Sequence, residues 1–180
     1  ITRPIPTFEI LSVVLKELQH VPPNQIVILV ATGTHRGNTL EELSMMLGAD
    51  VVNKFQVVNH DAFNEATTKY AGQTQDGIPI WLNSYWLDAQ IRITLGFAEP
   101  HFFAGFSGGP KMVAPGLAGI DTIMELHSPK LIGNPKSTWG RTTDKPIHQS
   151  IREIADYTWT IELTKGNDTI YSDLYTFTID

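Results

Sequence analysis

The sequence predicts an α/β protein, with a Rossmann-like layered domain in which a mostly parallel sheet carries helices on both faces. Three observations favour this class. Residues 25–31 form a continuous and largely β-branched apolar run, which is typical of a strand covered on both faces. A polar loop at residues 32–38 and a helical pattern at residues 39–47 follow it directly, as in a βα unit. Further strand-like runs then alternate with helical patterns, and ligand sites in such folds lie where strands end.

Each expected element has its own signal in the chain. A first helix at residues 7–20 carries apolar side chains at helical spacing after Pro6, and Gly48 suits the C-cap of the helix at 39–47. Residues 96–119 contain six glycines and three prolines, which is too broken for a long regular element. The remaining elements are strands at 54–59, 78–82 and 91–95, a helix or long turn at 61–71, helices at 117–126 and 147–155, and β-rich segments at 157–163 and 169–177.

The composition excludes several classes of function. The chain has 180 residues, enough for one well-buried core, and its formal net charge of −6 argues against nucleic-acid or anionic membrane partners. Because it has no cysteine, disulfides, iron–sulfur clusters and thiol nucleophiles are excluded, and a metal would sit on His, carboxylates or a carried-in ligand. No apolar run could span a bilayer and no secretory leader is visible, so we predict a cytoplasmic protein. The start at Ile1 rather than Met favours a piece of something longer.

Three of the six histidines are candidates for chemistry. His35 follows the first strand by four residues, in a loop at the end of the sheet where ligands bind in open α/β folds. His101 lies beside two Phe residues in the glycine-rich segment, and His127 ends a predicted helix. Each also has a simpler interpretation, as a surface-loop residue, a hydrogen-bonded packing residue and a cation favoured by the helix dipole, respectively. His60 could reach the same site, whereas His148 is expected to be exposed.

The segment at residues 105–112 reads Gly-Phe-Ser-Gly-Gly-Pro-Lys-Met. It fits the G-x-S-x-G pattern of α/β-hydrolases, with Asp121 and His127 following in the hydrolase order, but we expect no strand immediately before Ser107. It fails the phosphate-loop pattern because a proline and a methionine stand at required positions. A glycine-dense backbone can still approach an anionic or planar ligand closely, and it presents Lys111 as a salt-bridge partner or a covalent anchor. These residues alone support either an enzyme or a binding module.

Taken together, four motifs resemble the nickel-dependent lactate racemase family. They are I-T-R-P at 1–4, A-T-G-T-H-R at 31–36, P-H-F-F-A-G-F-S-G-G-P-K-M-V-A-P-G at 100–116 and E-L-H at 125–127. The long central motif is highly specific, and the resemblance covers essentially the whole chain. It implies that residues 1–180 are the cofactor-binding N-terminal domain, with both ends truncated and a C-terminal domain absent.

The resemblance implies a role for each matching residue. Lys111 would carry a covalently tethered nickel-pincer nucleotide, and His127 would complete the coordination of the nickel. His35 and His101 would be the two acid/base residues, and Arg3 would help to hold the substrate carboxylate. The cofactor-binding residues would also include Gly105, Ser107, Gly108 and Gly109.

The implied reaction is the racemisation or epimerisation of a small-molecule 2-hydroxy acid, such as lactate, by hydride transfer to and from the cofactor. One imidazole takes the hydroxyl proton and the other serves the opposite face of the 2-keto acid, each with a pKa near the working pH. Proteins that synthesise the cofactor would be further partners. Two alternatives remain, a serine hydrolase that uses Ser107 and a non-catalytic homologue that never receives the cofactor. The oligomeric state is not predicted.

Overall fold

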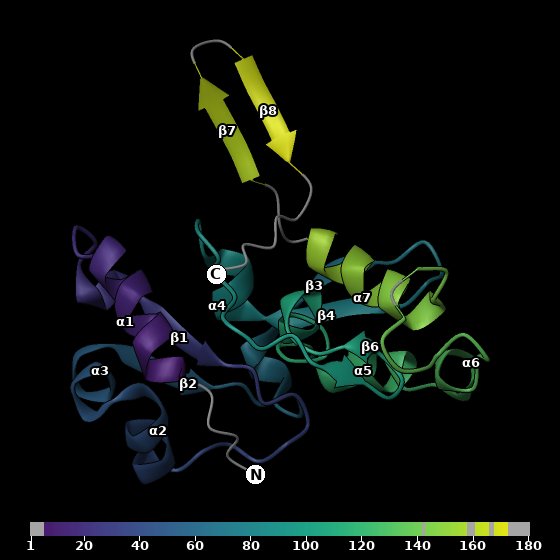
Figure 1. Ribbon diagram of the computed structural model, residues 1–180, viewed down its shortest axis with the longest axis horizontal. Helices are drawn as coiled ribbons and strands as arrows, with labels where there is room; N and C mark the ends of the chain where they lie inside the picture. Colours follow the sequence, from purple (N-terminus) through teal and green to yellow (C-terminus); the bar gives the residue numbers. More distant parts are fainter. Residues whose placement is uncertain (1–5, 142, 158–160, 166–167, 173–180) are drawn as a thin grey trace.

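The computed structural model describes residues 6–141, 143–157, 161–165 and 168–172, and it is a mixed α/β structure (Figure 1). The helices are α1 (Thr7–Glu17), α2 (Leu40–Leu47), α3 (Ala49–Lys54), α4 (Ser84–Asp88), α5 (Ile120–Leu126), α6 (Pro129–Ile132) and α7 (Pro146–Tyr157), with short 3-10 helices η1 (Pro23–Gln25), η2 (Glu65–Thr67) and η3 (Gly109–Met112). The strands are β1 (Val27–Val30), β2 (Gln56–Asn59), β3 (Thr68–Gln73), β4 (Pro79–Asn83), β5 (Pro100–His101), β6 (Gly105–Phe106), β7 (Ile161–Lys165) and β8 (Asp168–Ser172).

The described strands form four separate pairs, which corrects the prediction of one mostly parallel, Rossmann-like sheet. Only β1 and β2 are parallel, and the other three pairs are antiparallel. The connections explain the difference. Two helices, α2 and α3, provide the crossover that a parallel pair needs, whereas β3 and β4 are joined by a tight turn in which the Thr74 amide donates to the Ile78 carbonyl.

Two sequence-based element predictions need correction. The strand predicted at residues 91–95 is absent from the described structure, because the guanidinium of Arg92 donates to the carbonyls of Trp86 and Leu87 and holds this stretch against the end of α4. The helix or turn predicted at residues 61–71 is η2 followed by most of β3. The other elements predicted within the described residues are present with shifted bounds, whereas residues 158–160 and 173–177 of the two predicted C-terminal β-rich segments lie outside the described residues.

The first part of the chain is the predicted βα unit, with α1 added to it (Figure 1). A capping box starts α2, in which the Thr39 hydroxyl accepts from the Glu42 amide and the Glu42 carboxylate accepts from the Thr39 amide. Gly48 ends the helix with φ at +91°, and a Cβ there would lie 2.6 Å from the ring of Phe8. The small apolar cluster of this region consists of Leu11, Leu43, Leu47 and Val51.

The larger core lies among β3–β4, α5, α7 and the glycine-rich segment. Its innermost side chains, all essentially without solvent exposure, are Ile80, Leu82, Leu126, Ile147 and Ile154. His60, at the end of β2, joins the two parts of the molecule: its Nε2 donates to the Ala118 carbonyl at 2.8 Å, and its Nδ1 accepts from Asn83 at 3.1 Å. Burial lowers the pKa of His60, so this imidazole is a satisfied neutral core group. None of the helices in the described ranges is long and apolar enough to cross a membrane.

Candidate active site

His101 lies on the two-residue strand β5, opposite Gly105 on β6. Its ring stacks on Phe102 with centroids 4.7 Å apart and meets the edge of Phe103 at 4.6 Å. Its Nδ1 accepts the backbone N–H of Ala104 at 3.2 Å. An acceptor at Nδ1 places the proton of the neutral ring on Nε2, so this hydrogen-bond network assigns His101 the Nε2–H tautomer.

The environment of His101 opposes protonation of its ring. Burial is the largest cause, and the electrostatic effect of Lys111, Lys145 and His127 adds to it, which lowers the pKa of His101 to about 4. This differs from our expectation of a pKa near the working pH. His101 is therefore neutral at pH 7, and a negative charge bound beside it would raise its pKa.

His127 is the C-cap residue of α5, as the sequence indicated. Its Nδ1 lies 2.7 Å from the carbonyl oxygen of Ile123, and because a carbonyl can only accept, Nδ1 carries the proton. The Nε2 lone pair of the neutral ring is then available to a metal ion. A carbonyl that accepts from the other ring nitrogen is the usual support of a metal-binding histidine. Phe103, whose ring centroid is 5.2 Å from that of His127, touches both imidazoles.

Lys111 lies on η3, which packs against α7. Its backbone is tied at both ends, because its amide donates to the Gly108 carbonyl at 3.1 Å and its carbonyl accepts from Gly116 at 3.2 Å. The side chain is half-buried, and burial lowers the pKa of its amine. A less strongly protonated amine is a better nucleophile, which fits a covalent attachment point.

The glycines of the motif have unequal roles. Gly105 and Gly108 both have positive φ, and a Cβ on either would collide with backbone of the same chain, the Arg141 carbonyl for Gly105 and the Phe97 carbonyl for Gly108. Gly109 also has positive φ, but a Cβ there would meet nothing within 4 Å. The first two glycines are thus explained by close internal packing, and only Gly109 faces open space of the kind that we predicted for a ligand.

Ser107 does not belong to a hydrolase triad in the described structure. Its hydroxyl donates to the Phe97 carbonyl at 2.8 Å and accepts from the Glu99 amide at 3.1 Å. Contrary to our expectation, a strand, β6, immediately precedes it, but only the short η3 follows. The proton on His127 Nδ1 goes to Ile123 rather than to Asp121, so the histidine lacks the orientation that the triad requires.

His35 lies on an exposed loop after β1. The loop touches the Lys111 segment through its backbone, because the Gly33 amide donates to the Gly116 carbonyl at 3.0 Å. Within the described ranges, no hydrogen bond or ring contact involves the His35 imidazole. The structure therefore brings His101, Lys111 and His127 together and leaves His35 at the edge of this group. Arg3 lies outside the described residues.

Arg36, the residue after His35, forms an ion pair with Glu42. The Arg36 guanidinium donates to both carboxylate oxygens of Glu42, at 2.8 and 2.5 Å. This pair holds the pKa of the exposed Glu42 carboxyl down at about 2, with the amide of Thr39 adding to the effect. The ion pair links the His35 loop to the start of α2.

Two residues near His101 were missed or misread from the sequence. Lys145 is fully buried immediately before α7, and His148, predicted to be exposed, is half-buried and bonds to the Ala104 carbonyl. Only their position at the start of a predicted helix could have signalled them. Pattern alone does not show which segment a helix start packs against.

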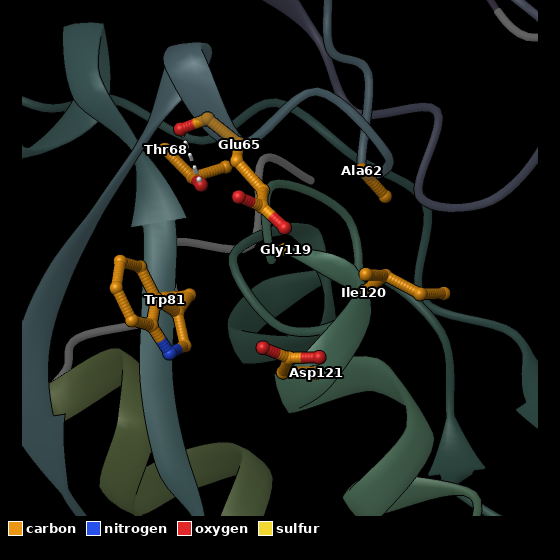
Figure 2. Close-up of a pocket in the computed structure, with 7 residues that line it drawn as sticks. All are labelled: Ala62, Glu65, Thr68, Trp81, Gly119, Ile120 and Asp121. Atoms are coloured by element: carbon orange, nitrogen blue, oxygen red, sulfur yellow. Dashed lines mark hydrogen bonds between the residues drawn. The ribbon is translucent and has the colours of Figure 1, made fainter.

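A separate pocket of about 150 Å³ lies at the start of α5, the opposite end of the helix from His127 (Figure 2). Glu65 and Asp121 point their carboxylates into it beside Trp81. Two carboxylates repel an anionic substrate, so this pocket does not suit a hydroxy acid. Within the described part of the chain, no group of three or more His, Asp or Glu side chains could hold a metal ion.

The sequence is similar to those of proteins in one known family. Residues 1–140 match the model of the lactate racemase N-terminal domain. The chain is 41% identical over 151 residues to the lactate racemase of Lactiplantibacillus plantarum and 37% identical over 151 residues to that of Thermoanaerobacterium thermosaccharolyticum. Both matches cover 83% of this chain but only 36% and 35% of those proteins, so the chain spans just over a third of their length.

Solved structures show a corresponding likeness of fold. The lactate racemase apoprotein from Thermoanaerobacterium thermosaccharolyticum aligns with a TM-score of 0.82 at 36% identity, over 87% of this chain and 38% of that chain. A protein from Thermotoga maritima aligns with a TM-score of 0.72 over 96% of this chain and 47% of that one. At 21% identity, the second likeness concerns the fold alone.

Proposed function

Because this chain belongs to the lactate racemase N-terminal domain family, we propose that it is the cofactor-binding N-terminal domain of an isomerase that racemises or epimerises lactate-like 2-hydroxy acids. The observation that carries the proposal is the grouping of His101, Lys111 and His127, each in a suitable chemical state. One is a neutral imidazole, one is a half-buried amine, and one is an imidazole with an available lone pair.

We propose a nickel-pincer nucleotide attached at Lys111 as the cofactor, with His127 Nε2 as a ligand of the nickel. The described residues fit this group, because the amine is partly desolvated and the Ile123 carbonyl supports the imidazole from behind. When bound, the cofactor would accept the hydride from the substrate and return it. Open space beside Gly109 supports its place near the cofactor, whereas Gly105, Gly108 and Ser107 would shape the loop from within.

The protein's own residues would handle the protons. In its present tautomer His101 offers Nε2–H to a substrate oxygen, and to take a proton it must release Nδ1 from the Ala104 amide or turn. His35 has no such bond in the described structure, so either ring nitrogen can accept a proton. We propose these two imidazoles as the acid/base pair and Arg3 as the partner of the substrate carboxylate. Proteins that make the cofactor would be the other partners.

The proposal is tested by producing the complete protein together with cofactor-synthesis proteins and measuring its intact mass and nickel content. We expect a covalent mass increase and bound nickel, both lost in Lys111→Arg, which keeps the charge but presents a guanidinium instead of the amine. The loaded protein should interconvert the enantiomers of at least one acid in a panel of chiral 2-hydroxy acids. An unmodified Lys111 without nickel would favour a non-catalytic homologue, and labelling of Ser107 by a fluorophosphonate would favour a hydrolase.

A further inference from the structure

We propose that Lys145 is a positioning residue for His101. Lys145 clamps the hairpin of β5 and β6, which carries this imidazole, by fixing the segment that packs against Gly105, and it keeps a positive charge near the imidazole. The inference deepens the proposed function and rests on it for the role of His101. Its structural part, the clamp itself, can be measured without any cofactor. Lys145 does not touch the open side of the site, so it is not assigned a catalytic role.

The burial of Lys145 is unusual for a lysine. Its side chain has 0% relative exposure, and lysine is almost never fully buried unless it is paired. Its Nζ donates to the Thr138 carbonyl at 2.5 Å. Across the described ranges, no carboxylate lies within 4 Å of this ammonium group. Burial, and after it the charge of Arg141, lowers the pKa of this amine. Because a cation placed in this way is expensive to bury, we expect a role that uses its hydrogen bond and its charge.

The contacts of Lys145 lead directly to the hairpin of His101. Its Nζ lies 3.4 Å from the position of a Cβ on Gly105, the residue that pairs with His101 across the hairpin. The Gly140 amide donates to the Gly105 carbonyl at 3.1 Å. Lys145, through Thr138, thus holds the segment that packs against the back of Gly105.

A second residue of the same helix face reaches the neighbouring peptide group. His148 follows Lys145 by three residues, and positions with this spacing lie on one side of a helix. Its imidazole bonds to the Ala104 carbonyl, while the Ala104 amide donates to His101 Nδ1 at 3.2 Å. The start of α7 therefore supports the hairpin turn that fixes the tautomer of His101.

The charges around His101 act in one direction. The groups that face it are Lys111 from η3, His127 from the end of α5 and Lys145 from the start of α7. None of them is a carboxylate, so none of them favours protonation of the imidazole, and the charges of the two lysines oppose it. A neutral ring keeps Nδ1 as an acceptor and preserves the bond from Ala104. The proposed cofactor chemistry gives a role to Lys111 and to His127, but none to Lys145.

The test compares Lys145→Met, which removes both the charge and the donor, with Lys145→Gln, which removes the charge and keeps an N–H donor. Lys136→Met, at an exposed lysine, is the matched control for loss of one positive charge. The readouts are the NMR-detected pKa of His101 and the hydrogen-exchange rate of the Gly140 amide, both in the cofactor-free protein.

We expect both Lys145 variants to raise the pKa of His101 from about 4 towards its ordinary value, and Lys136→Met to leave it unchanged. The Gly140 amide should exchange about tenfold faster in Lys145→Met and close to the parental rate in Lys145→Gln. An unchanged pKa of His101 in both variants, or unchanged Gly140 exchange in Lys145→Met, would overturn the proposal. Failure of Lys111 to take up a cofactor would instead count against the proposed function alone.

A measurement on the unaltered chain covers the case in which the variants do not fold. A buried, hydrogen-bonded ammonium group exchanges its protons slowly enough to be seen in a nitrogen-edited spectrum. Lys145 should give such a signal at neutral pH, and exposed Lys136 should not. Equally fast proton exchange at the two lysines would contradict the clamp.

Discussion

The two regions that carry the candidate histidines hold them in different ways. In the N-terminal βα unit, whose apolar cluster has four buried members, His35 is exposed on a loop. In the region of the larger core, His101 on the glycine-rich segment and His127 at the end of α5 are half-buried, and a backbone group fixes the tautomer of each. The difference teaches that His101 and His127 are held in fixed orientations by the surrounding backbone, whereas a bound ligand can still set the orientation of His35.

The largest expected effects come from removing the two imidazoles of the proposed acid/base pair. His101→Gln and His35→Gln should each lower racemisation by the cofactor-loaded, complete protein by about 10²–10⁴-fold, the usual value of one acid/base group. Both variants should retain the covalent cofactor, as measured by intact mass. Only His101→Gln should also change the melting temperature, because within the described ranges the His35 imidazole makes no hydrogen bond or ring contact that could be lost. Parental rates in both variants would refute the two-base assignment.

Within the glycine-rich segment, Gly105 and Gly109 provide a matched pair of positions. Gly105→Ala should lower the free energy of unfolding by about 3 kcal/mol or more, because its Cβ meets the Arg141 carbonyl in a left-handed conformation. Gly109→Ala, also at a positive φ but facing open space, should cost about 1–2 kcal/mol. Chemical denaturation of both variants measures the difference. Equal losses would mean that the hairpin and the Arg141 segment do not pack as described.

The pH dependence of stability should also distinguish the regions. Between pH 6.5 and about 4, the unfolded chain binds a proton at His101 and the folded chain does not, so stability falls as the pH is lowered through this window. His60 and His148, whose pKa values are also lowered by burial, act in the same direction. His101→Gln should flatten this dependence. Denaturation midpoints measured across this pH range provide the check.

The smallest expected effect lies at the start of α2. Thr39→Ala removes the hydroxyl that accepts the Glu42 amide and should cost about 1 kcal/mol of stability. Ser44→Ala, inside the same helix, is the control, because its hydroxyl only donates back to the Leu40 carbonyl and its loss should be nearly neutral. Urea denaturation of the two variants would show whether the cap matters to the His35 region. Equal free energies of unfolding for the two variants would show that the Thr39 cap does not stabilise α2.

Local patterns predicted most of the elements but not their pairing. The apolar run at 25–31, the helix that Gly48 ends and the helix before His127 all depend on short-range preferences, and all are present. The strand predicted at 91–95 failed, because apolar spacing cannot show that Arg92 is drawn to the end of α4. The parallel sheet failed for a similar reason, since turn length, rather than strand composition, set the direction of β4.

For the candidate site too, the sequence predicted which residues to consider but not their environment. The sequence alone was enough to assign the chain to its family. It also nominated Lys111, His101, His127 and His35 as candidates, because a specific motif and rare residue types mark them, and their roles stay predictions. Only the tertiary structure decided that Gly105 and Gly108 serve internal packing, that the pKa of His101 is lowered and that Lys145 is buried near Gly105. Protonation, tautomer and burial depend on charges and carbonyls from segments distant in the chain, and linear spacing does not encode those distances.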